Sequence, residues 1–130
     1  MDNKHIPYPR HVCLVSSEAD VEILGKKQHK QDIITLSWHM PTSFEPRLYA
    51  ISIGKERFSY RRIKESGVFC VNFLPYEMKD KALFCGRNTG EHINKFSEAG
   101  LTPAECKKVH CPRIREAVAY MECEVVDEIE

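Results

Sequence analysis

The chain has 130 residues, and its 19 Lys and Arg residues balance its 19 Asp and Glu residues to a formal net charge of zero. With 42% hydrophobic residues, this length predicts one folded domain over residues 1–130 and excludes a disordered chain. The balanced charge argues against a nucleic-acid-binding protein, which normally carries a basic excess. No apolar run approaches the roughly 20 residues that span a bilayer, and residues 1–10 resemble no secretory signal. We therefore expect a cytoplasmic protein with no membrane partner.

The cysteines are expected to be reduced and mostly buried, because several lie within apolar, strand-like segments. They are Cys13, Cys70, Cys85, Cys106, Cys111 and Cys123. His110 lies between two of them, but no second ligand pair follows at zinc-like spacing, so we expect no metal. A reactive thiol at Cys85 would require a nearby positive charge, for which Arg87 is the candidate, and a packed small side chain is the favoured interpretation.

Five segments are rich in β-branched and apolar residues and predict strands: 11–16, 33–38, 48–53, 68–74 and 119–126. Residues 25–31 are basic and turn-like, and a loop with Pro41 and Pro46 separates the second and third strands. Residues 68–74 form a nearly continuous apolar run, which indicates a central strand buried on both faces. In the last strand, alternation places Tyr120, Glu122 and Glu124 on one face.

Three short helices are predicted between these strands. Ser59 is a candidate N-cap for a helix over 60–66, with Gly67 at its C-terminal end. Helical patterns follow at 79–85 and 91–99, the latter with Thr89 as cap and Gly100 as stop. Several strand connections lack the helix that a parallel crossover requires, so the pattern favours a mainly β protein with short helices, built as an antiparallel barrel. The barrel's last strand then needs further chain or a partner subunit to pair with.

A possible anion site lies at the start of the first helix. Helix N-termini attract phosphate groups, Arg57 could hold two phosphate oxygens, and Ser59 could donate a hydrogen bond. The alternative is an ordinary serine cap beside a solvated arginine.

The segment from Thr35 to Trp38 carries small residues that would let a flat aromatic ring approach the backbone. The alternative is an amphipathic strand with a tryptophan in the core. Asn72 in a buried strand must find hydrogen-bond partners, either from neighbouring backbone or from a ligand. His39 could donate a proton or hydrogen bond at a ligand edge, although a partly exposed loop histidine is the favoured interpretation.

Seven sequence blocks together resemble one family. In order they are SW (37–38), P–SF–P (41–46), ISIG (51–54), RFSY (57–60), IKESGVFCVNFL (63–74), CGR (85–87) and NKFSEAGLT (94–102). From about Tyr8 onward the chain resembles the flavin reductase-like family of FMN-binding split β-barrels, which includes flavoredoxins. The resemblance implies a split barrel, bound FMN rather than FAD, and a homodimer with the flavin between subunits.

The resemblance also implies a set of cofactor-binding residues. The residues matching the isoalloxazine wall are Thr35, Leu36, Ser37, Trp38, Ser52, Ile53 and Gly54. Arg57, Ser59 and Tyr60 match the phosphate and ribityl end, and Asn72 matches a polar residue that faces the flavin. Gly86, Arg87 and Lys95 match residues that close the site.

The chain departs from the family pattern at three places. Asp32 stands where relatives usually have Asn, and Pro46 and Arg47 replace a proline pair. A later block that helps receive the nicotinamide is absent, so the sequence looks C-terminally truncated. Two functions remain open: an NAD(P)H-dependent reductase that passes electrons through FMN to free flavin, ferric complexes or a partner, and a flavoredoxin-like electron carrier or flavin-binding module without its own nicotinamide-dependent activity.

Overall fold

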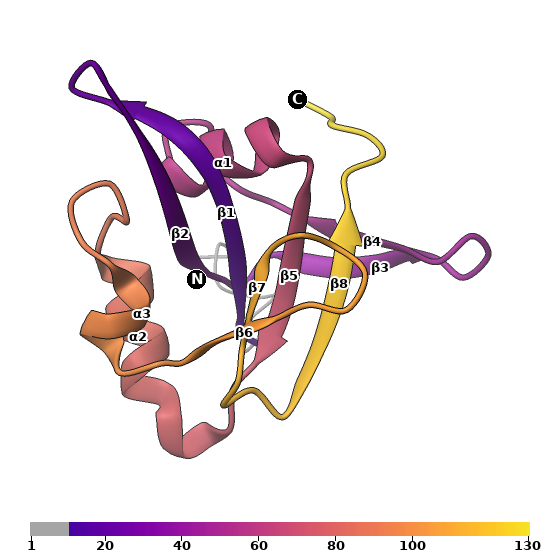
Figure 1. The fold of residues 1–130 in the computed structure, drawn as a ribbon. Coiled ribbons are helices and arrows are strands. Elements are labelled where there is room, and N and C mark those ends of the chain that lie inside the picture. The colour runs from indigo at the N-terminus through magenta and orange to yellow at the C-terminus, as the bar shows by residue number, and fades with distance from the viewer. Residues whose placement is uncertain (1–10) are drawn as a thin grey trace, which may run out of the picture.

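A computed structural model describes residues 11–130, and the expectation for residues 1–10 lies outside this range. Its centre is a four-stranded sheet in the order β2-β1-β5-β8, with every neighbouring pair antiparallel. The four strands are β1 (Cys13–Ile23), β2 (Lys26–Leu36), β5 (Val68–Phe73) and β8 (Ala119–Glu124). Figure 1 shows this sheet with the helices placed around it. The architecture confirms the predicted mainly β, antiparallel fold.

The remaining elements are three helices, a 3₁₀ turn and two small hairpins. The helices are α1 (Phe58–Ser66), α2 (Lys79–Arg87) and α3 (Lys95–Ala99), and the 3₁₀ turn is η2 (Tyr76–Met78). The hairpins pair β3 (His39–Ser43) with β4 (Leu48–Ile51), and β6 (Pro103–Glu105) with β7 (Pro112–Ile114). In Figure 1 the β3–β4 hairpin extends outward beyond β8, and α2 and α3 lie near β2. No described helix is long and apolar enough to cross a membrane.

The sheet is buried on both faces, and strand alternation assigns neighbouring residues to opposite apolar clusters. One cluster joins the sheet to α1 and β4, and its buried members are Cys13, Val15, Ile34, Ile63, Phe69 and Val71. The other joins the sheet to α2, α3 and β7, and its buried members are Leu14, Ile33, Cys85, Phe96, Leu101 and Ile114. This double burial explains the continuous apolar run of β5 and confirms its central position.

Asn72 is the polar exception within β5, and the structure satisfies it internally. Its amide nitrogen donates to the Leu14 carbonyl at 3.0 Å and to Ser16 Oγ at 2.9 Å. Its side-chain oxygen accepts the Ile114 N–H at 2.9 Å, while Ser16 Oγ donates to the Pro112 carbonyl. These bonds join β1, β5 and β7. Asn72 is fully buried, and a buried amide group requires hydrogen-bond partners of this kind.

The largest correction concerns the basic stretch at 25–31, of which residues 26–31 are strand rather than turn. β1 and β2 form one long hairpin that closes at Leu24 and Gly25, both with positive φ of 52° and 79°. Two consecutive residues of this kind make the tight turn that matches the twist of paired strands. The polar alternation of this exposed end hid the strand, because its side chains face solvent.

Local elements differ in four further places. Pro41 lies within β3 rather than in a loop, and β6 and β7 form a hairpin where a polar loop was predicted. Helix α1 begins two residues earlier than predicted, at Phe58, with Arg57 at the N-cap. Helix α3 is only five residues long, with Asn94 rather than Thr89 as its side-chain cap. The predicted stop at Gly67 is confirmed, with a left-handed φ of 76°.

The outer end of the β1–β2 hairpin carries a histidine held between two carboxylates. His29 Nδ1 lies 2.8 Å from Asp20, and its Nε2 lies 2.8 Å from Glu18. Hydrogen bonds to Glu18 and then Asp20 raise the pKa of His29 above 6.5. His110 Nε2 also approaches Glu18, at 3.6 Å. Both ring nitrogens of His29 can donate only when the ring is protonated.

We predict that the contacts of His29 with Glu18 and Asp20 stabilise the β1–β2 hairpin at acidic pH and not at alkaline pH. The contribution to the free energy of unfolding should be complete below about pH 6.5, because the charged ring is the form that both carboxylates bind. It should disappear as the pH rises through the raised pKa of His29 in the folded state. The gain should be small because His29 is 54% exposed. Urea denaturation at a series of pH values measures the free energy of unfolding, and the values for the wild type and His29→Gln should converge at high pH. The control is His92→Gln, which changes a histidine on an exposed loop. A difference in free energy of unfolding between wild type and His29→Gln that grows with pH would contradict the assignment.

Candidate functional site

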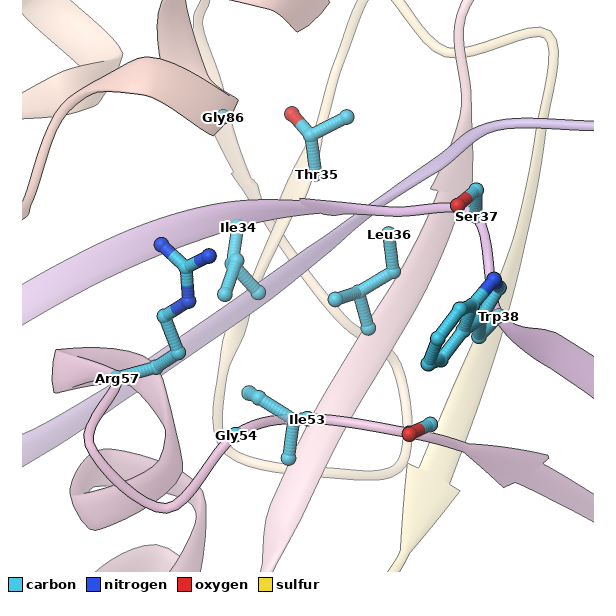
Figure 2. A pocket seen from close by; sticks show the side chains of 10 residues that line it. Ile34, Thr35, Leu36, Ser37, Trp38, Ile53, Gly54, Arg57 and Gly86 are labelled. Atoms are coloured by element: carbon cyan, nitrogen blue, oxygen red, sulfur yellow. The ribbon is translucent and has the colours of Figure 1, made fainter. Parts of the chain in front are cut away.

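A pocket of about 330 Å³ lies at the end of β2, between this strand, the segment after β4, and the ends of α1 and α2. Figure 2 shows Arg57 at one end of the pocket and Trp38 at the other, with apolar side chains between them. The lining residues are Ile34, Thr35, Leu36, Ser37, Trp38, Ser52, Ile53, Gly54, Arg57 and Gly86. The pocket is within the size range of small-molecule sites.

The position of β2 in the sheet makes its backbone available to a ligand. β2 pairs with β1 on one side and is the edge strand of the described sheet. An edge strand presents backbone N–H and C=O groups that no neighbouring strand uses. Beyond β2, the Trp38 carbonyl accepts the Ser52 N–H at 2.9 Å, which joins the two walls of the pocket.

Close approach of α2 to β2 forms one side of the pocket. A Cβ on Gly86 would lie 3.2 Å from Thr35 Cβ, which is tighter than ordinary contact. Thr35 Oγ1 donates to the Ala82 carbonyl at 2.6 Å and so fixes the helix against the strand. In Figure 2, Thr35 points toward Gly86, while Ile34 and Leu36 point to the other side of the strand. Gly86 therefore leaves space that any larger residue would fill.

The positive end of the pocket is formed by the start of α1. No described side chain caps this nine-residue helix, so its first N–H groups keep their partial positive charge. The guanidinium of Arg57 is exposed at this point and donates to no residue in the described range 11–130. An anionic group in the pocket would meet both features.

Nine of the fourteen residues predicted as cofactor-binding line this pocket. They are Thr35, Leu36, Ser37, Trp38, Ser52, Ile53, Gly54, Arg57 and Gly86. The sequence analysis missed Ile34, although its alternation with Leu36 along the same strand could have revealed it. The other five, Ser59, Tyr60, Asn72, Arg87 and Lys95, do not line the pocket.

Ser59 and Lys95 belong to a buried polar network behind β2 rather than to the pocket surface. Ser59 Oγ donates to the carboxylate of Asp32, so it neither caps α1 nor is free for a phosphate. Lys95 Nζ donates to the Ile33 carbonyl at 2.6 Å and to the Cys85 carbonyl at 2.8 Å, and lies 3.7 Å from Asp32 Oδ1. Burial lowers the pKa of Lys95, and the charge of Asp32 partly offsets this effect.

Asp32, which stands where the family usually has Asn, is accommodated by this buried polar network. Its carboxylate is fully buried, between Ser59 on α1 and Lys95 on α3. A Cβ on Gly90 would overlap the same carboxylate, so glycine is required in the loop that follows α2. Asp32 therefore links both layers over the sheet and does not face the pocket.

The remaining predicted residues lie elsewhere. Asn72 makes the internal hydrogen bonds described above, toward β1 and β7, and does not line the pocket. Tyr60 donates from its hydroxyl to Glu128 at 2.8 Å. Arg87 is exposed at the end of α2. His39 is engaged at both nitrogens, by the Tyr49 hydroxyl at 2.6 Å and the His11 carbonyl at 2.7 Å, so it is not a free donor at the ligand edge.

The six cysteines are all free, and four are buried. Burial raises the pKa of the Cys85 thiol to about 11, despite the nearby charge of Lys95. Cys85 therefore packs as a small apolar residue, as favoured from the sequence. Among residues 11–130, no three His, Cys, Asp or Glu side chains are grouped to hold a metal ion.

Residues 5–130 match the family described as Flavin reductase like domain. The chain belongs to this flavin reductase-like family. The match covers nearly the whole chain and confirms the resemblance found in the sequence blocks. The split-barrel fold expected from that resemblance is confirmed by structural similarity.

Three relatives of this flavin reductase-like chain illustrate the match. An uncharacterized protein of Archaeoglobus fulgidus is 38% identical over 101 residues, covering 78% of this chain and 57% of that protein. The flavoredoxin of Desulfovibrio vulgaris (Miyazaki F) is 26% identical with a TM-score of 0.83, covering 95% of this chain and 63% of that chain. An FMN-binding protein from Thermus thermophilus has a TM-score of 0.82 at 19% identity, over 98% of this chain and 65% of that chain, and shows the shared fold.

We predict that Lys95→Met strongly destabilises the fold. The substitution removes the donor for the Ile33 and Cys85 carbonyls and leaves Asp32 without its buried counter-charge, so the free energy of unfolding should fall by about 3 kcal/mol. Urea denaturation measures the loss.

Lys81→Met is the matched control, because Lys81 also donates to two backbone carbonyls, those of Ala99 and Gly100, but from a half-exposed position without a buried carboxylate. Its loss should be about 1 kcal/mol. Equal losses for the two variants would show that burial and the carboxylate do not matter.

Proposed function

We propose that the pocket at the end of β2 binds FMN and that the protein is an FMN-dependent reductase of the flavin reductase-like family. The observation that carries this proposal is the polarity of the pocket, with an exposed arginine and a helix N-terminus at one end and small and apolar residues at the other. FMN has the matching division into a phosphate and a planar ring system. Family membership and the FMN-binding neighbour support this ligand.

The residues present fit the phosphate of FMN. Arg57 can form a paired hydrogen bond with phosphate oxygens, and the uncapped start of α1 provides backbone N–H donors. Neither Ser59 nor Tyr60 is needed for this contact. The phosphate is thus bound by one side chain and the helix dipole, and FAD, whose bridging pyrophosphate has no terminal dianionic phosphate, is less favoured.

The residues present also fit the ring system. Gly54 and Gly86 are small residues beside the ring position, and the outer edge of β2 offers backbone hydrogen-bonding groups between Ile34 and Leu36. Ile53 and Leu36 provide an apolar surface for the flat ring. The chain's residues therefore bind and orient the ring and exclude water from one face of it.

Bound FMN would supply the hydride- and electron-transfer chemistry that links NAD(P)H to free flavin, a ferric complex or a partner protein. The protein contributes placement and electrostatics to this chemistry, and among residues 11–130 Arg57 is the one titratable side chain that lines the pocket. We further propose a homodimer in the cytoplasm. The exposed side chains of Trp38, Met40 and Phe44, on and beside the projecting β3–β4 hairpin, support a subunit contact next to the pocket.

Arg57→Gln should weaken FMN binding about 10- to 100-fold, because a charge-assisted hydrogen bond contributes about 1.5–3 kcal/mol. Riboflavin, which lacks the phosphate, should bind the variant and the wild type equally. Quenching of flavin fluorescence measures both affinities.

Arg61→Gln is the control for this measurement, because Arg61 lies on the same helix, is exposed, and pairs with Glu91 at 3.0 Å. It should leave FMN affinity unchanged. Equal loss of FMN and riboflavin affinity in Arg57→Gln would place the phosphate elsewhere, and failure of the wild type to bind FMN would end the proposal.

The NAD(P)H-dependent step is tested by mixing the FMN-loaded protein with NADPH or NADH without oxygen. Rapid bleaching of the flavin absorbance is expected of a reductase. Bleaching only by dithionite would instead establish a flavin-holding electron carrier. Free FMN at the same concentration is the control for the uncatalysed reaction.

A further inference from the structure

The β6–β7 hairpin brings two cysteines face to face. Cys106 directly follows β6 and Cys111 directly precedes β7, so they form the next pair after Glu105 and Pro112 in the ladder. The Cys106 N–H donates to the Cys111 carbonyl at 3.4 Å, and the two sulfur atoms lie 3.9 Å apart. Opposed residues of an antiparallel pair have Cα atoms about 4.5–5.5 Å apart, within the range that a disulfide spans.

The loop between the two cysteines is held in this shape by β8. The carboxylate of Glu122 accepts the backbone N–H groups of Lys107, Lys108 and Val109 at 3.1, 2.6 and 3.1 Å. Burial alone would raise the pKa of Glu122, but these bonds bring it below its usual value. The carboxylate is therefore ionised at neutral pH and keeps the loop closed.

The two thiols differ in access. Cys111 is 4% exposed, and the neighbouring Pro112 and Ile114 are tied to the sheet through Ser16 and Asn72. Cys106 is only half-buried. An oxidant in solution therefore reaches Cys106 first, and the fixed sulfur of Cys111 lies beside it to complete the bond.

We propose that Cys106 and Cys111 form a reversible disulfide, so that the β6–β7 loop is a redox modification site. With hydrogen peroxide as oxidant, the Cys106 sulfur attacks the O–O bond, becomes a sulfenic acid and releases one water. The Cys111 sulfur then attacks that of Cys106, the S–O bond breaks, and a second water leaves. Two thiols and one peroxide thus become one disulfide and two waters, and a dithiol reverses the reaction by exchange.

One other thiol competes for Cys106. Cys70 on β5 is fully buried and close enough for a hydrogen bond between the two sulfurs. A link to Cys70 would join the loop to the sheet interior, whereas the proposed link stays within one hairpin. The two products are chemically distinct, and peptide mapping separates them.

The test uses the whole protein, oxidised with hydrogen peroxide and then alkylated under denaturing conditions. Alkylation should find four thiols instead of the six free thiols of the reduced protein, and a dithiol should restore all six. Trypsin cleaves after Lys107 and Lys108, between the two cysteines. The expected product is therefore the peptide 96–107 joined to the peptide 109–113, detected by mass spectrometry.

Substitutions check the assignment. Cys106→Ser should abolish the linked peptide, and Cys123→Ser, which removes another half-buried thiol, should leave it unchanged. The wild-type peptide map does not depend on either variant folding. Peptides linking Cys106 to Cys70, a link between two protein molecules, or full alkylation of Cys106 after oxidation would each overturn the proposal.

Discussion

The central constraint on this molecule is that its sheet is covered on both faces, so polar groups within β1, β2 and β5 must be satisfied inside the protein. Asn72 and Ser16 do this by joining β1, β5 and β7. Asp32 accepts a hydrogen bond from Ser59, and the Lys95 ammonium lies 3.7 Å from its other carboxylate oxygen. The described sheet has two edge strands, β2 and β8, and the pocket lies at the end of β2, where the outer backbone edge can meet a ligand.

The buried lysine connects the fold to the pocket. Lys95 bonds to Ile33 on β2 and to Cys85 on α2, and the next residues along the chain from these two, Ile34 and Gly86, both line the pocket. One side chain from α3 thus sets the distance between two walls that it does not itself line.

The pocket combines a positive end with an apolar surface, and each part comes from a different layer of the fold. Arg57 and the uncapped start of α1 lie over one face of the sheet, and Gly86 at the end of α2 lies over the other. The edge strand between them belongs to both layers. This arrangement suits a ligand with a phosphate and a planar ring, which is the chemistry proposed above, and the redox-active hairpin at β6–β7 involves none of the pocket's lining residues.

The sequence by itself determined the antiparallel, mainly β class, the central place of β5, the end of α1 at Gly67, and most of the pocket, because apolar runs, glycine stops and family blocks are local signals. It did not reveal the full length of β1 and β2, since exposed polar strands lack an apolar alternation. Only the tertiary structure decided that Asn72, Ser59 and Lys95 are internal, because a polar side chain in an apolar segment can be satisfied by protein or by ligand. The packing of distant segments supplies the partner, and local sequence carries no record of it.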